Sequence, residues 1–331
     1  MRDACNPSQD TRRTLLGCNV HVPIALIAFA AMISQNPTTS NNPIFPGWYA
    51  DPEIHVYENR YYVYPTYSAP YDKQTFLEAF SSPDLVNWHR EGRVLDFKDI
   101  PWSTNRAAWA PTVILRDGTY YMYFGAGDGA GLGVATSKHP GGPFKDALGK
   151  PLIKDVINGA QPIDAMAFLD DDGQAYLYYG GWKHANVVKL SKDMLHTEGE
   201  FKEITPEGYV EGSFMLKRNS EYVFMWSEGG WTDSSYGVAY ARSKSPTGPF
   251  VRKGKVLGTD PLVGKGAGHH SVLQLPGTDD YVICYHRRPL DENDANARVV
   301  CLDKLEFDKN GDILPVQQTV TGVRAHPLAK R

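Results

Sequence analysis

The chain has 331 residues, of which 42% are hydrophobic and 12% aromatic, so it can bury a large core in one large domain or two smaller ones. Only 22% of the residues are charged and the formal net charge is −4, which excludes an electrostatic basis for a nucleic-acid partner. The 31 Gly, 23 Pro and 19 Tyr residues favour short strands joined by tight turns, so we expect an all-β fold and not a helical one.

The first forty residues differ in composition from the rest of the chain. Arg12 and Arg13 precede an apolar run from Val20 to Ile33, and a polar stretch from Ser34 to Asn42 follows. This order is typical of a secretory signal, whereas the alternative is an apolar N-terminal helix that packs on the domain. We predict that residues 1–40 are a signal peptide or N-terminal anchor with a polar linker. The protein is then exported, to the periplasm or the extracellular space, and keeps no stable membrane partner once the signal is removed.

From residue 41 to residue 331 the chain carries an internal repeat. Each copy has a strand pattern, a turn and a second, tyrosine-rich strand pattern. The copies are Asp51–Tyr67, Trp109–Gly125, Asp164–Gly180, Glu211–Ser227 and His269–His286. Their first residues are 58, 55, 47 and 58 positions apart. A second piece follows the hairpin in three copies, as Ser81–Trp88, Thr136–Phe144 and Arg242–Phe250.

Units of about fifty residues with four short strands are typical of β-propeller blades. The sequence therefore predicts a single five-bladed β-propeller over residues 41–331. A β-sandwich with coincidental Tyr-Tyr strands does not explain the ordered recurrence of both pieces.

Chemically useful side chains stand at the start of the first strand in each repeat. The innermost strands of a propeller begin at one face of the central tunnel, so Asp51, Trp109, Asp164, Glu211 and His269 should converge on one funnel. Burying acids beside apolar strand residues is costly unless they have a partner or a use. Two carboxyl groups that face a common pocket suit glycosidic bond cleavage, because one protonates the leaving oxygen and the other activates water or attacks the sugar. A third carboxylate raises the pKa of the acid and can orient it.

Four aromatic residues are candidates for stacking on sugar rings. They are Trp48, Trp109 and Trp231, with Phe214 shortly after Glu211. Aromatic faces beside acids suit the apolar faces of sugars, and plain core packing is the alternative for each of them.

The motifs together resemble glycoside hydrolase family 43, whose catalytic domain is a five-bladed β-propeller. They are Ala50-Asp51-Pro52, Ala110-Pro111 after Trp109, Ile163-Asp164, Glu211-Gly212 and Gly268-His269, and the resemblance covers residues 43–325. It implies that Asp51 is the general base, that Glu211 is the general acid and that Asp164 tunes the pKa of the acid and orients it. It also implies a single displacement that inverts the anomeric centre, with base and acid wider apart than in a retaining pair and with no cofactor required for the chemistry.

The resemblance implies two further site residues. His269 matches a histidine that contacts a structural calcium ion, or its waters, in the central tunnel, and a core histidine bonded to a backbone carbonyl is the alternative. Arg298 matches an arginine that reaches the pocket from the last blade, with Arg287 and Arg288 as competitors for that role.

By the same resemblance, we expect an exo-acting inverting hydrolase of plant cell-wall pentose polymers, with arabinose- or xylose-containing oligosaccharides or polysaccharides as partners. An α-L-arabinofuranosidase is expected first, and a β-D-xylosidase or an endo-arabinanase of the same fold is the alternative. A non-catalytic carbohydrate-binding propeller would not need three acids at strand starts. A retaining invertase-type propeller would carry Asn-Asp-Pro and Arg-Asp-Pro motifs, whereas this chain has Ala50-Asp51-Pro52 and Pro162-Ile163-Asp164.

Two smaller features lie outside the candidate site. Cys284 and Cys301 occupy strand patterns on either side of the turn at Asp291–Asn296, so the thiols could face each other in a hairpin and form a disulfide. Two buried free thiols are the alternative. The acidic run Asp170–Gly173 lies at a hairpin tip, and we interpret it as a solvated turn instead of a metal loop.

Overall fold

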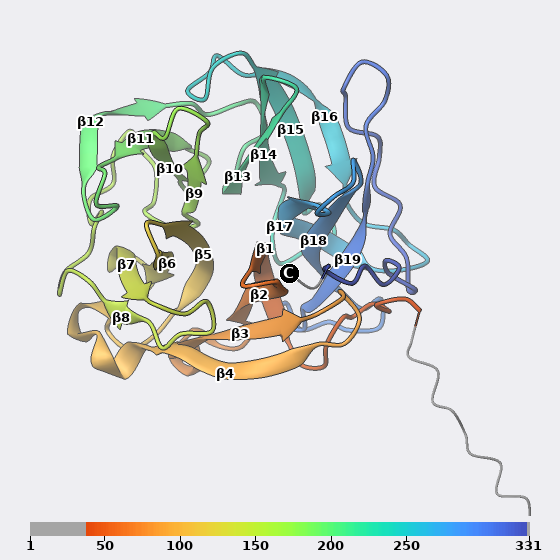
Figure 1. The fold of residues 1–331 in the computed structure, drawn as a ribbon, viewed down its shortest axis with the longest axis horizontal. Helices are drawn as coiled ribbons and strands as arrows, with labels where there is room; N and C mark the ends of the chain where they lie inside the picture. Colours follow the sequence, from red (N-terminus) through yellow and green to blue (C-terminus); the bar gives the residue numbers. More distant parts are fainter. Residues whose placement is uncertain (1–37, 330–331) are drawn as a thin grey trace, which may run out of the picture. The chain divides into compact units, whose positions relative to one another are not determined.

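The computed structural model describes residues 38–329, so most of the predicted signal or anchor lies outside the described residues. The strands form five antiparallel sheets that surround a central axis (Figure 1). Four sheets have four strands and the last has three, each in chain order from the axis outward. The prediction of an all-β five-bladed propeller is confirmed.

The strands, blade by blade, have the following bounds. Blade 1 has β1 (Tyr49–Tyr57), β2 (Arg60–Tyr67), β3 (Phe76–Ser82) and β4 (His89–Asp96). Blade 2 has β5 (Trp109–Arg116), β6 (Thr119–Ala126), β7 (Gly131–Ser137) and β8 (Lys145–Asp146). Blade 3 has β9 (Met166–Leu169), β10 (Ala175–Tyr179), β11 (Asn186–Leu190) and β12 (Thr197–Glu203). Blade 4 has β13 (Glu211–Arg218), β14 (Glu221–Glu228), β15 (Gly237–Ser243) and β16 (Val251–Leu257). Blade 5 has β17 (Lys265–Gln274), β18 (Tyr281–Arg288) and β19 (Val299–Leu305).

Helical structure within residues 38–329 is limited to three short 3₁₀ turns, η1 (Tyr71–Lys73), η2 (Phe97–Asp99) and η3 (Pro101–Ser103). In this part of the chain no helix has the length and apolar character needed to span a membrane.

The repeated hairpins of the sequence are the first two strands of each blade. Three of them turn on two residues that both have positive φ, which are Glu58-Asn59, Asp117-Gly118 and Asn219-Ser220. This is the backbone of a type I′ turn, whose twist matches that of the flanking strands. Asp, Asn and Gly tolerate this conformation best, which explains the turn residues seen in the sequence.

A recurrent tyrosine explains why the two pieces of the repeat occur together. Tyr64, Tyr123 and Tyr178 lie at matching positions of the second strands in blades 1, 2 and 3, and all three are fully buried. Each hydroxyl donates to a backbone carbonyl in the next blade, at the connection between its third and fourth strands. The acceptors are Pro140 (2.9 Å), Met194 (2.8 Å) and Pro246 (2.6 Å). The second piece of the repeat thus receives the tyrosine of the preceding blade, which fills the space between blades without leaving the phenol unpaired.

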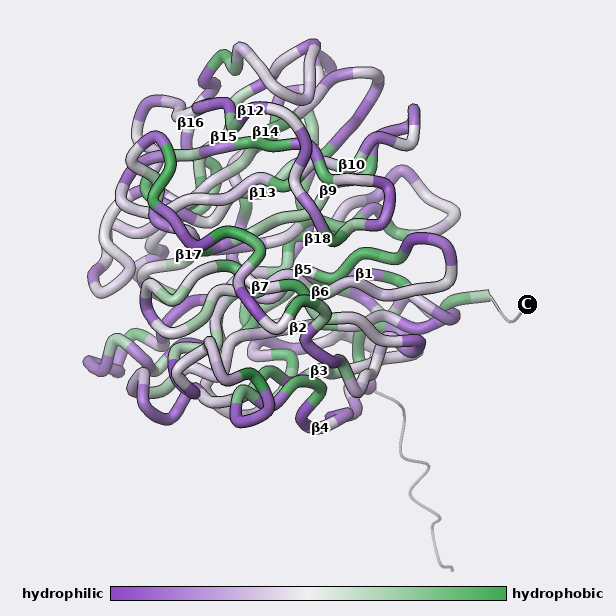
Figure 2. Tube along the Cα trace, turned by 90° about the vertical axis from the view of Figure 1, so that its left-hand side faces the viewer, coloured by the Kyte–Doolittle hydropathy of each residue, from purple (hydrophilic) through white to green (hydrophobic). Residues whose placement is uncertain are grey.

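Hydrophobic residues follow the strands, and hydrophilic residues gather at the connecting loops (Figure 2). The largest cluster of buried hydrophobic residues lies between blades 3, 4 and 5 and includes Phe224 and Trp226, both completely buried. Blade 5 is extended by the N-terminal segment, since the Ile44 amide donates to the Val300 carbonyl (3.0 Å) and the Ser40 amide donates to the Val323 carbonyl (2.8 Å). Both ends of the described chain therefore meet at the last blade.

Each innermost strand contains an irregularity close to the axis. In blades 1, 2, 4 and 5 the register of the first hairpin shifts there, and in blade 3 the chain turns just before β9. One residue in each blade has left-handed φ at this point: Asp51 (49°), Ala110 (43°), Asp164 (55°), Gly212 (68°) and His269 (31°). A β-bulge of this kind bends the strand and re-aims its side chains, and such bulges are frequent beside active sites.

The backbone amides of four of these residues are bonded to side chains of the preceding blade. Ala110 donates to Thr66 Oγ1 (2.7 Å) and Gly212 donates to Asp164 Oδ2 (3.1 Å). His269 donates to Ser227 Oγ (3.0 Å), and Asp51 donates to His286 Nδ1 (3.1 Å), which closes the ring from blade 5 to blade 1. The amides left free by the bulges are therefore satisfied between blades.

The structure decides one alternative that the sequence leaves open and corrects part of one prediction. Cys301 pairs with Tyr285 and Cys284 pairs with Leu302, so an offset of one residue places the two thiols on opposite faces of the sheet. Both cysteines are buried and free, as in the alternative. In the acidic run, Asp171 and Asp172 are exposed at the hairpin tip as predicted. Asp170 is the exception: it is 7% exposed, pairs with Lys217 and accepts a hydrogen bond from the Tyr222 hydroxyl (2.5 Å), so it connects blade 3 to blade 4.

Candidate active site

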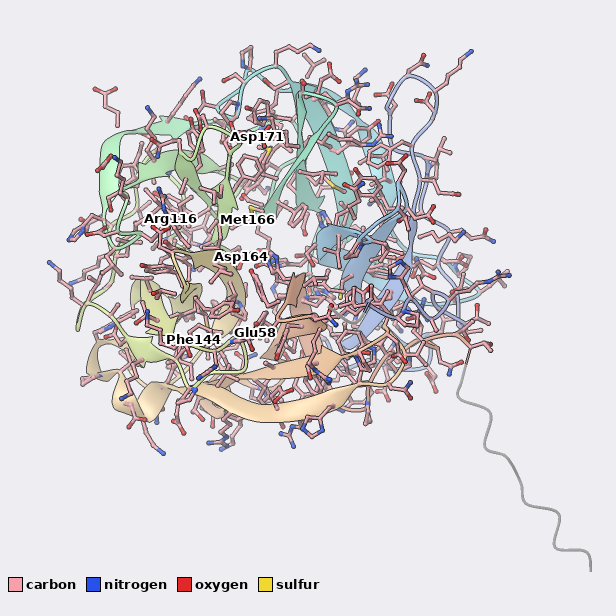
Figure 3. The ribbon with its side chains drawn as sticks, in the orientation of Figure 1. Glu58, Arg116, Phe144, Asp164, Met166 and Asp171 are labelled. Carbon is pink, nitrogen blue, oxygen red and sulfur yellow. The ribbon has the colours of Figure 1, made fainter. Side chains whose placement is uncertain are left out.

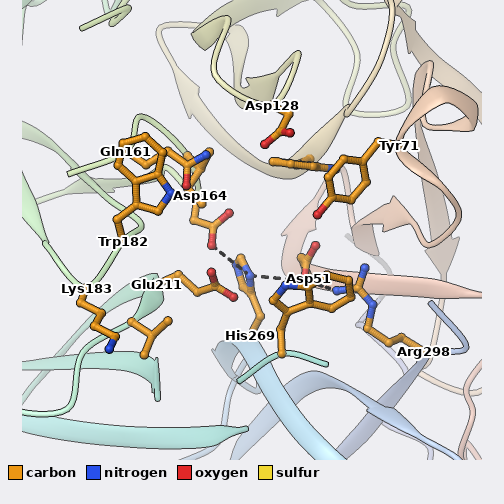
Figure 4. A pocket seen from close by; sticks show the side chains of 14 residues that line it. Asp51, Tyr71, Asp128, Gln161, Asp164, Trp182, Lys183, Glu211, His269 and Arg298 are labelled. Carbon is orange, nitrogen blue, oxygen red and sulfur yellow. Dashed lines mark hydrogen bonds and ion pairs between the residues drawn. The ribbon is translucent and has the colours of Figure 1, made fainter. Parts of the chain in front are cut away.

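A cavity of about 370 Å³ lies where the innermost strands begin (Figure 4). All three acids of the predicted site, Asp51, Asp164 and Glu211, line it. They come from blades 1, 3 and 4, and Asp164 stands beside the central axis (Figure 3). The volume is at the lower end of the range for ligand pockets and suits a ligand of one or two sugar rings better than a long chain.

Asp51 is surrounded by nitrogen atoms. Its Oδ1 lies 3.3 Å from His269 Nδ1 and 3.5 Å from Arg298 Nη1. Burial opposes ionisation of this carboxyl, but the neighbouring imidazole and the Arg298 guanidinium outweigh it and hold the pKa of Asp51 well below its usual range. Asp51 is therefore an ionised carboxylate at neutral pH.

His286 is neutral and holds the backbone of Asp51. Its Nδ1 accepts the hydrogen bond from the Asp51 amide (3.1 Å), so the ring proton is on Nε2. Burial lowers the pKa of His286 to about 4, so the ring is neutral at neutral pH. The approach of Nδ1 to Asp51 Oδ1 at 3.3 Å is consequently not an ion pair.

Glu211 and Asp164 have the opposite electrostatic environment. Burial raises the pKa of Glu211; a hydrogen bond from the Tyr236 hydroxyl to Oε1 (2.8 Å) acts against this rise, and the negative charge of Asp51 adds to it. Burial also raises the pKa of Asp164 well above its usual value, and the charges of Glu211 and Asp51 act in the same direction. The environment therefore favours the protonated form of these two carboxyl groups and the ionised form of Asp51.

His269 lies between the ionised Asp51 and the carboxyl group of Asp164. Its Nδ1 lies 3.3 Å from Asp51 Oδ1 and 3.5 Å from Asp164 Oδ2, and burial lowers the pKa of the imidazole (Figure 4). Within residues 38–329 no group of three His, Cys, Asp or Glu side chains is arranged to hold a metal ion. Calcium takes six to eight oxygen ligands, so these residues do not form a protein cage for it. The calcium contact at His269 stays a prediction.

The predicted substrate-binding residues divide into two groups. Trp109, Trp231 and Arg298 line the cavity, with the Arg298 guanidinium 5.1 Å from the centre of the Trp231 ring. Trp48 is 41% exposed and lies outside the lining, and Phe214 is buried in the core with its ring 5.5 Å from that of His270. Phe214 follows the bulge in β13, which turns it away from the cavity that Glu211 faces.

The competing arginines have other partners. Arg287 donates to the Tyr285 hydroxyl and to the Thr319 carbonyl. Arg288 donates to the backbone carbonyls of Thr232 and Asp233, and so holds the loop that carries Trp231.

Sequence reasoning missed the residues that the loops contribute. Tyr71 on η1, Asp128 between β6 and β7, Gln161 before β9, and Trp182 and Lys183 between β10 and β11 all line the cavity. Their loops differ in length from blade to blade, so the repeat carries no signal for them. Tyr236 was also missed, although its position just before β15 places it near the axis.

The family model described as "Glycosyl hydrolases family 43" matches residues 40–313. The chain belongs to glycoside hydrolase family 43. The members of this family are inverting glycosidases, so this family 43 protein is a glycoside hydrolase.

Several relatives of this family 43 chain are similar over most of their length. A β-D-galactofuranosidase of Aspergillus niger is 50% identical over 308 residues, which cover 88% of this chain and 90% of the relative. A xylosidase/arabinosidase of Humicola insolens is 30% identical, over 80% of this chain and 95% of the relative. The solved structure of an α-L-arabinofuranosidase from Clostridium thermocellum has a TM-score of 0.70 and 32% identity, over 83% of this chain and 95% of that one.

Proposed function

We propose that this family 43 protein is an exo-acting furanosidase that removes terminal β-D-galactofuranosyl residues with inversion, and that α-L-arabinofuranosides are its second class of substrate. The observation that carries the proposal is the 50% identity to a β-D-galactofuranosidase over 88% of the chain, in a protein whose three acids meet in one small cavity. The cavity size favours removal of a single terminal sugar over cleavage inside a polymer.

The second substrate follows from sugar stereochemistry. β-D-Galactofuranose and α-L-arabinofuranose have the same configuration around the furanose ring, and galactofuranose differs by carrying an exocyclic diol in place of a hydroxymethyl group. A pocket that binds one ring therefore accepts the other. The 30% identical xylosidase/arabinosidase and the 32% identical α-L-arabinofuranosidase support this candidate, which is the activity expected from the sequence.

We assign the catalytic roles from the electrostatics of the site. Asp51, kept ionised beside Arg298, takes a proton from a water molecule as that water attacks the anomeric carbon. Glu211, whose burial favours the protonated form, donates its proton to the glycosidic oxygen as the bond to the leaving sugar breaks. Asp164, whose own pKa is raised by burial and by the charge of Glu211, orients the acid by accepting a hydrogen bond from the Gly212 amide next to Glu211.

Two polar side chains in the wall are proposed to bind sugar hydroxyls. The Tyr71 hydroxyl and the Gln161 amide line the cavity. Gln161 is only 8% exposed and lines the cavity, so its amide is available to a ligand there. A sugar hydroxyl would satisfy it.

The substrate is tested with three aryl glycosides in parallel: 4-nitrophenyl β-D-galactofuranoside, α-L-arabinofuranoside and β-D-xyloside. We expect kcat/KM to fall in that order, with the xyloside last because it is a pyranoside. Fastest hydrolysis of the xyloside would contradict the furanosidase assignment. Hydrolysis of the arabinofuranoside alone would favour an α-L-arabinofuranosidase over a β-D-galactofuranosidase.

The catalytic roles are tested with Glu211→Ala and Asp51→Ala. Each variant should lose about 10²–10⁴-fold in kcat on a substrate with an alkyl leaving group, because the proton transfer is lost. An aryl leaving group of low pKa needs no protonation, so it should restore much of the rate of Glu211→Ala and none of the rate of Asp51→Ala. Equal rescue of both variants would refute the assignment of acid and base.

The exported location also remains our proposal, supported by the basic, apolar and polar order of residues 1–40. N-terminal sequencing of protein recovered from outside producing cells should find a start between residues 28 and 42. An intact Met1 on active protein outside the cells would contradict removal of a signal.

A further inference from the structure

We propose that a groove next to the catalytic cavity binds the leaving part of an oligosaccharide substrate, with Trp182 as the stacking surface for the first leaving sugar. This inference rests on the proposed function, because it takes Glu211 as the acid. It adds a binding site on the leaving side and a preference for substrates with at least two sugars beyond the scissile bond.

The position of Glu211 determines on which side the leaving sugar lies. The acid must contact the glycosidic oxygen, so the leaving sugar lies on the Glu211 side of the cavity. The loop between β10 and β11 is anchored at that side, because the Lys183 amide donates to the carbonyl of Val210, the residue before Glu211 (3.1 Å). Trp182 and Lys183 both line the cavity there (Figure 4).

Trp182 is held in an exposed position by a strained backbone. Its side chain is 61% exposed, and both Trp182 and Lys183 have left-handed φ, 54° and 69°. Two consecutive non-glycine residues in this conformation cost stability, and such strain persists where the surrounding structure fixes it. Here the fixing contacts are the Lys183–Val210 bond and a bond from the Gly181 amide to the Gln161 carbonyl (3.1 Å). An indole at the rim of a sugar pocket offers a flat apolar face for a sugar ring.

A groove continues outward from this point. Lys183 and Val210 line the catalytic cavity and the groove alike, so the two spaces are adjacent. The groove runs between the β12–β13 connection, with Pro206 and Gly208, and the start of the β14–β15 connection at Gly229 and Gly230. A Cβ atom on Gly229 would lie 2.3 Å from the Ser235 carbonyl oxygen, so only glycine fits at this point of the wall. An extended chain can therefore leave the cavity along the backbone of blade 4.

The test compares a substrate that fills the groove with one that cannot reach it. The first is a trisaccharide of β-(1→5)-linked galactofuranose, which places two sugars on the leaving side. The second is methyl β-D-galactofuranoside, which has an alcohol leaving group of similar chemistry and no leaving sugar. Kinetics are measured for the wild type, for Trp182→Ala and Lys183→Ala, and for Trp182→Phe, which keeps an aromatic ring. Val251→Ala is the matched control, because Val251 is 64% exposed on β16 and lines neither space.

We expect Trp182→Ala to lower kcat/KM for the trisaccharide roughly tenfold, the loss of one stacking contact, and to leave the methyl glycoside within about twofold. Trp182→Phe should recover most of the loss, Lys183→Ala should show a smaller loss on the trisaccharide only, and Val251→Ala should match the wild type on both substrates. An equal loss on both substrates, or no loss on either, would overturn the groove while leaving the furanosidase assignment intact. A wild type that hydrolyses neither furanoside would overturn the proposed function, and the groove with it.

Discussion

Tyr236 connects the acid and the base of the catalytic centre. Its hydroxyl donates to Glu211 Oε1 (2.8 Å), and its ring stacks on the imidazole of His286 at 5.7 Å and 13°. His286 in turn accepts the Asp51 amide. The tyrosine ring is closely confined, since a Cβ atom on Gly268 would lie 2.3 Å from its Cδ1. Tyr236 is therefore a positioning residue that fixes one oxygen of Glu211 and leaves the other to carry the proton.

Replacing this tyrosine by phenylalanine should change the pH profile in one direction. The hydroxyl stabilises the ionised form of Glu211, so its removal raises the pKa of that carboxyl. Because the acid must be protonated to react, the alkaline limb of kcat/KM should move to higher pH in Tyr236→Phe, while the acidic limb, set by Asp51, stays in place. We expect kcat to fall about tenfold through the loss of orientation, with KM little changed.

Tyr178→Phe is the matched control for the loss of a buried hydroxyl. Tyr178 is fully buried and donates to the Pro246 carbonyl, away from the acids. It should lose stability without any shift of either limb. An alkaline limb that stays in place or moves to lower pH in Tyr236→Phe would refute the role assigned to Tyr236.

At the scale of the strand, the bulges determine how each functional side chain enters the funnel. Asp51, Asp164 and His269 are themselves the left-handed residues, whereas Glu211 and Trp109 directly precede theirs, Gly212 and Ala110. The sequence predicts that all five side chains share one face, and it treats their positions as equivalent. The positions of these side chains relative to the left-handed residue differ by one, because the element that repeats is the bulge and not the start of the strand. A bulge leaves no periodic pattern of hydrophobic residues, so the sequence does not reveal its position.

In blade 2, the hydrogen bond between the bulge amide and the preceding blade should contribute to stability more than to catalysis. Thr66 is fully buried, and its Oγ1 accepts the Ala110 amide at 2.7 Å. Thr66→Val keeps the shape but leaves that amide without an acceptor, so we expect the free energy of unfolding to fall by about 1–3 kcal/mol. Urea unfolding followed by tryptophan fluorescence measures the change.

Thr66→Ser keeps the hydroxyl and removes only a methyl group, which makes it the control. It should recover most of the stability lost in Thr66→Val, although a small cavity remains. Catalysis should survive in both variants, because Thr66 lies outside the lining of the cavity. Equal destabilisation by Val and Ser would mean that packing of the methyl group, and not the hydrogen bond, is what Thr66 contributes.

At the scale of the whole molecule, the number of blades could be predicted from the sequence because the hairpin recurs five times, and the first three blades also repeat the same tyrosine contact with the next blade. The tyrosines at 64, 123 and 178 and their carbonyl acceptors are local patterns at fixed spacing. The walls of the cavity could not be predicted in this way, since Tyr71 and Trp182 lie in the connections between second and third strands, which occur in every blade but differ in length and sequence. The thiols of Cys284 and Cys301 show the same limit, because a shift of one residue in register reverses a strand's faces.

The arrangement of acids in one buried funnel should lower the stability of the fold. Burial and the charge of Asp51 raise the pKa of Glu211 above the value of 4.5 that it has when unfolded. An acid whose pKa is raised by folding contributes its full stability below its unfolded pKa and loses it as the pH rises through the folded pKa. Near pH 7 the raised pKa of Glu211 therefore lowers the free energy of unfolding, although the same raised pKa is useful for catalysis.

Glu211→Gln should consequently be more stable than the wild type at neutral pH while it is inactive. The amide keeps the shape of the side chain and an acceptor for the Tyr236 hydroxyl, but it has no charge to bury. We expect Tm to rise by about 2–4 °C at pH 7 and the difference to shrink as the pH approaches 4, where the wild-type carboxyl is protonated in both states. Asp279→Asn, which removes an exposed charge in the connection between β17 and β18, should show no such gain. A stability difference that persists unchanged at pH 4 would mean that the substitution acts through packing and not through the charge of Glu211.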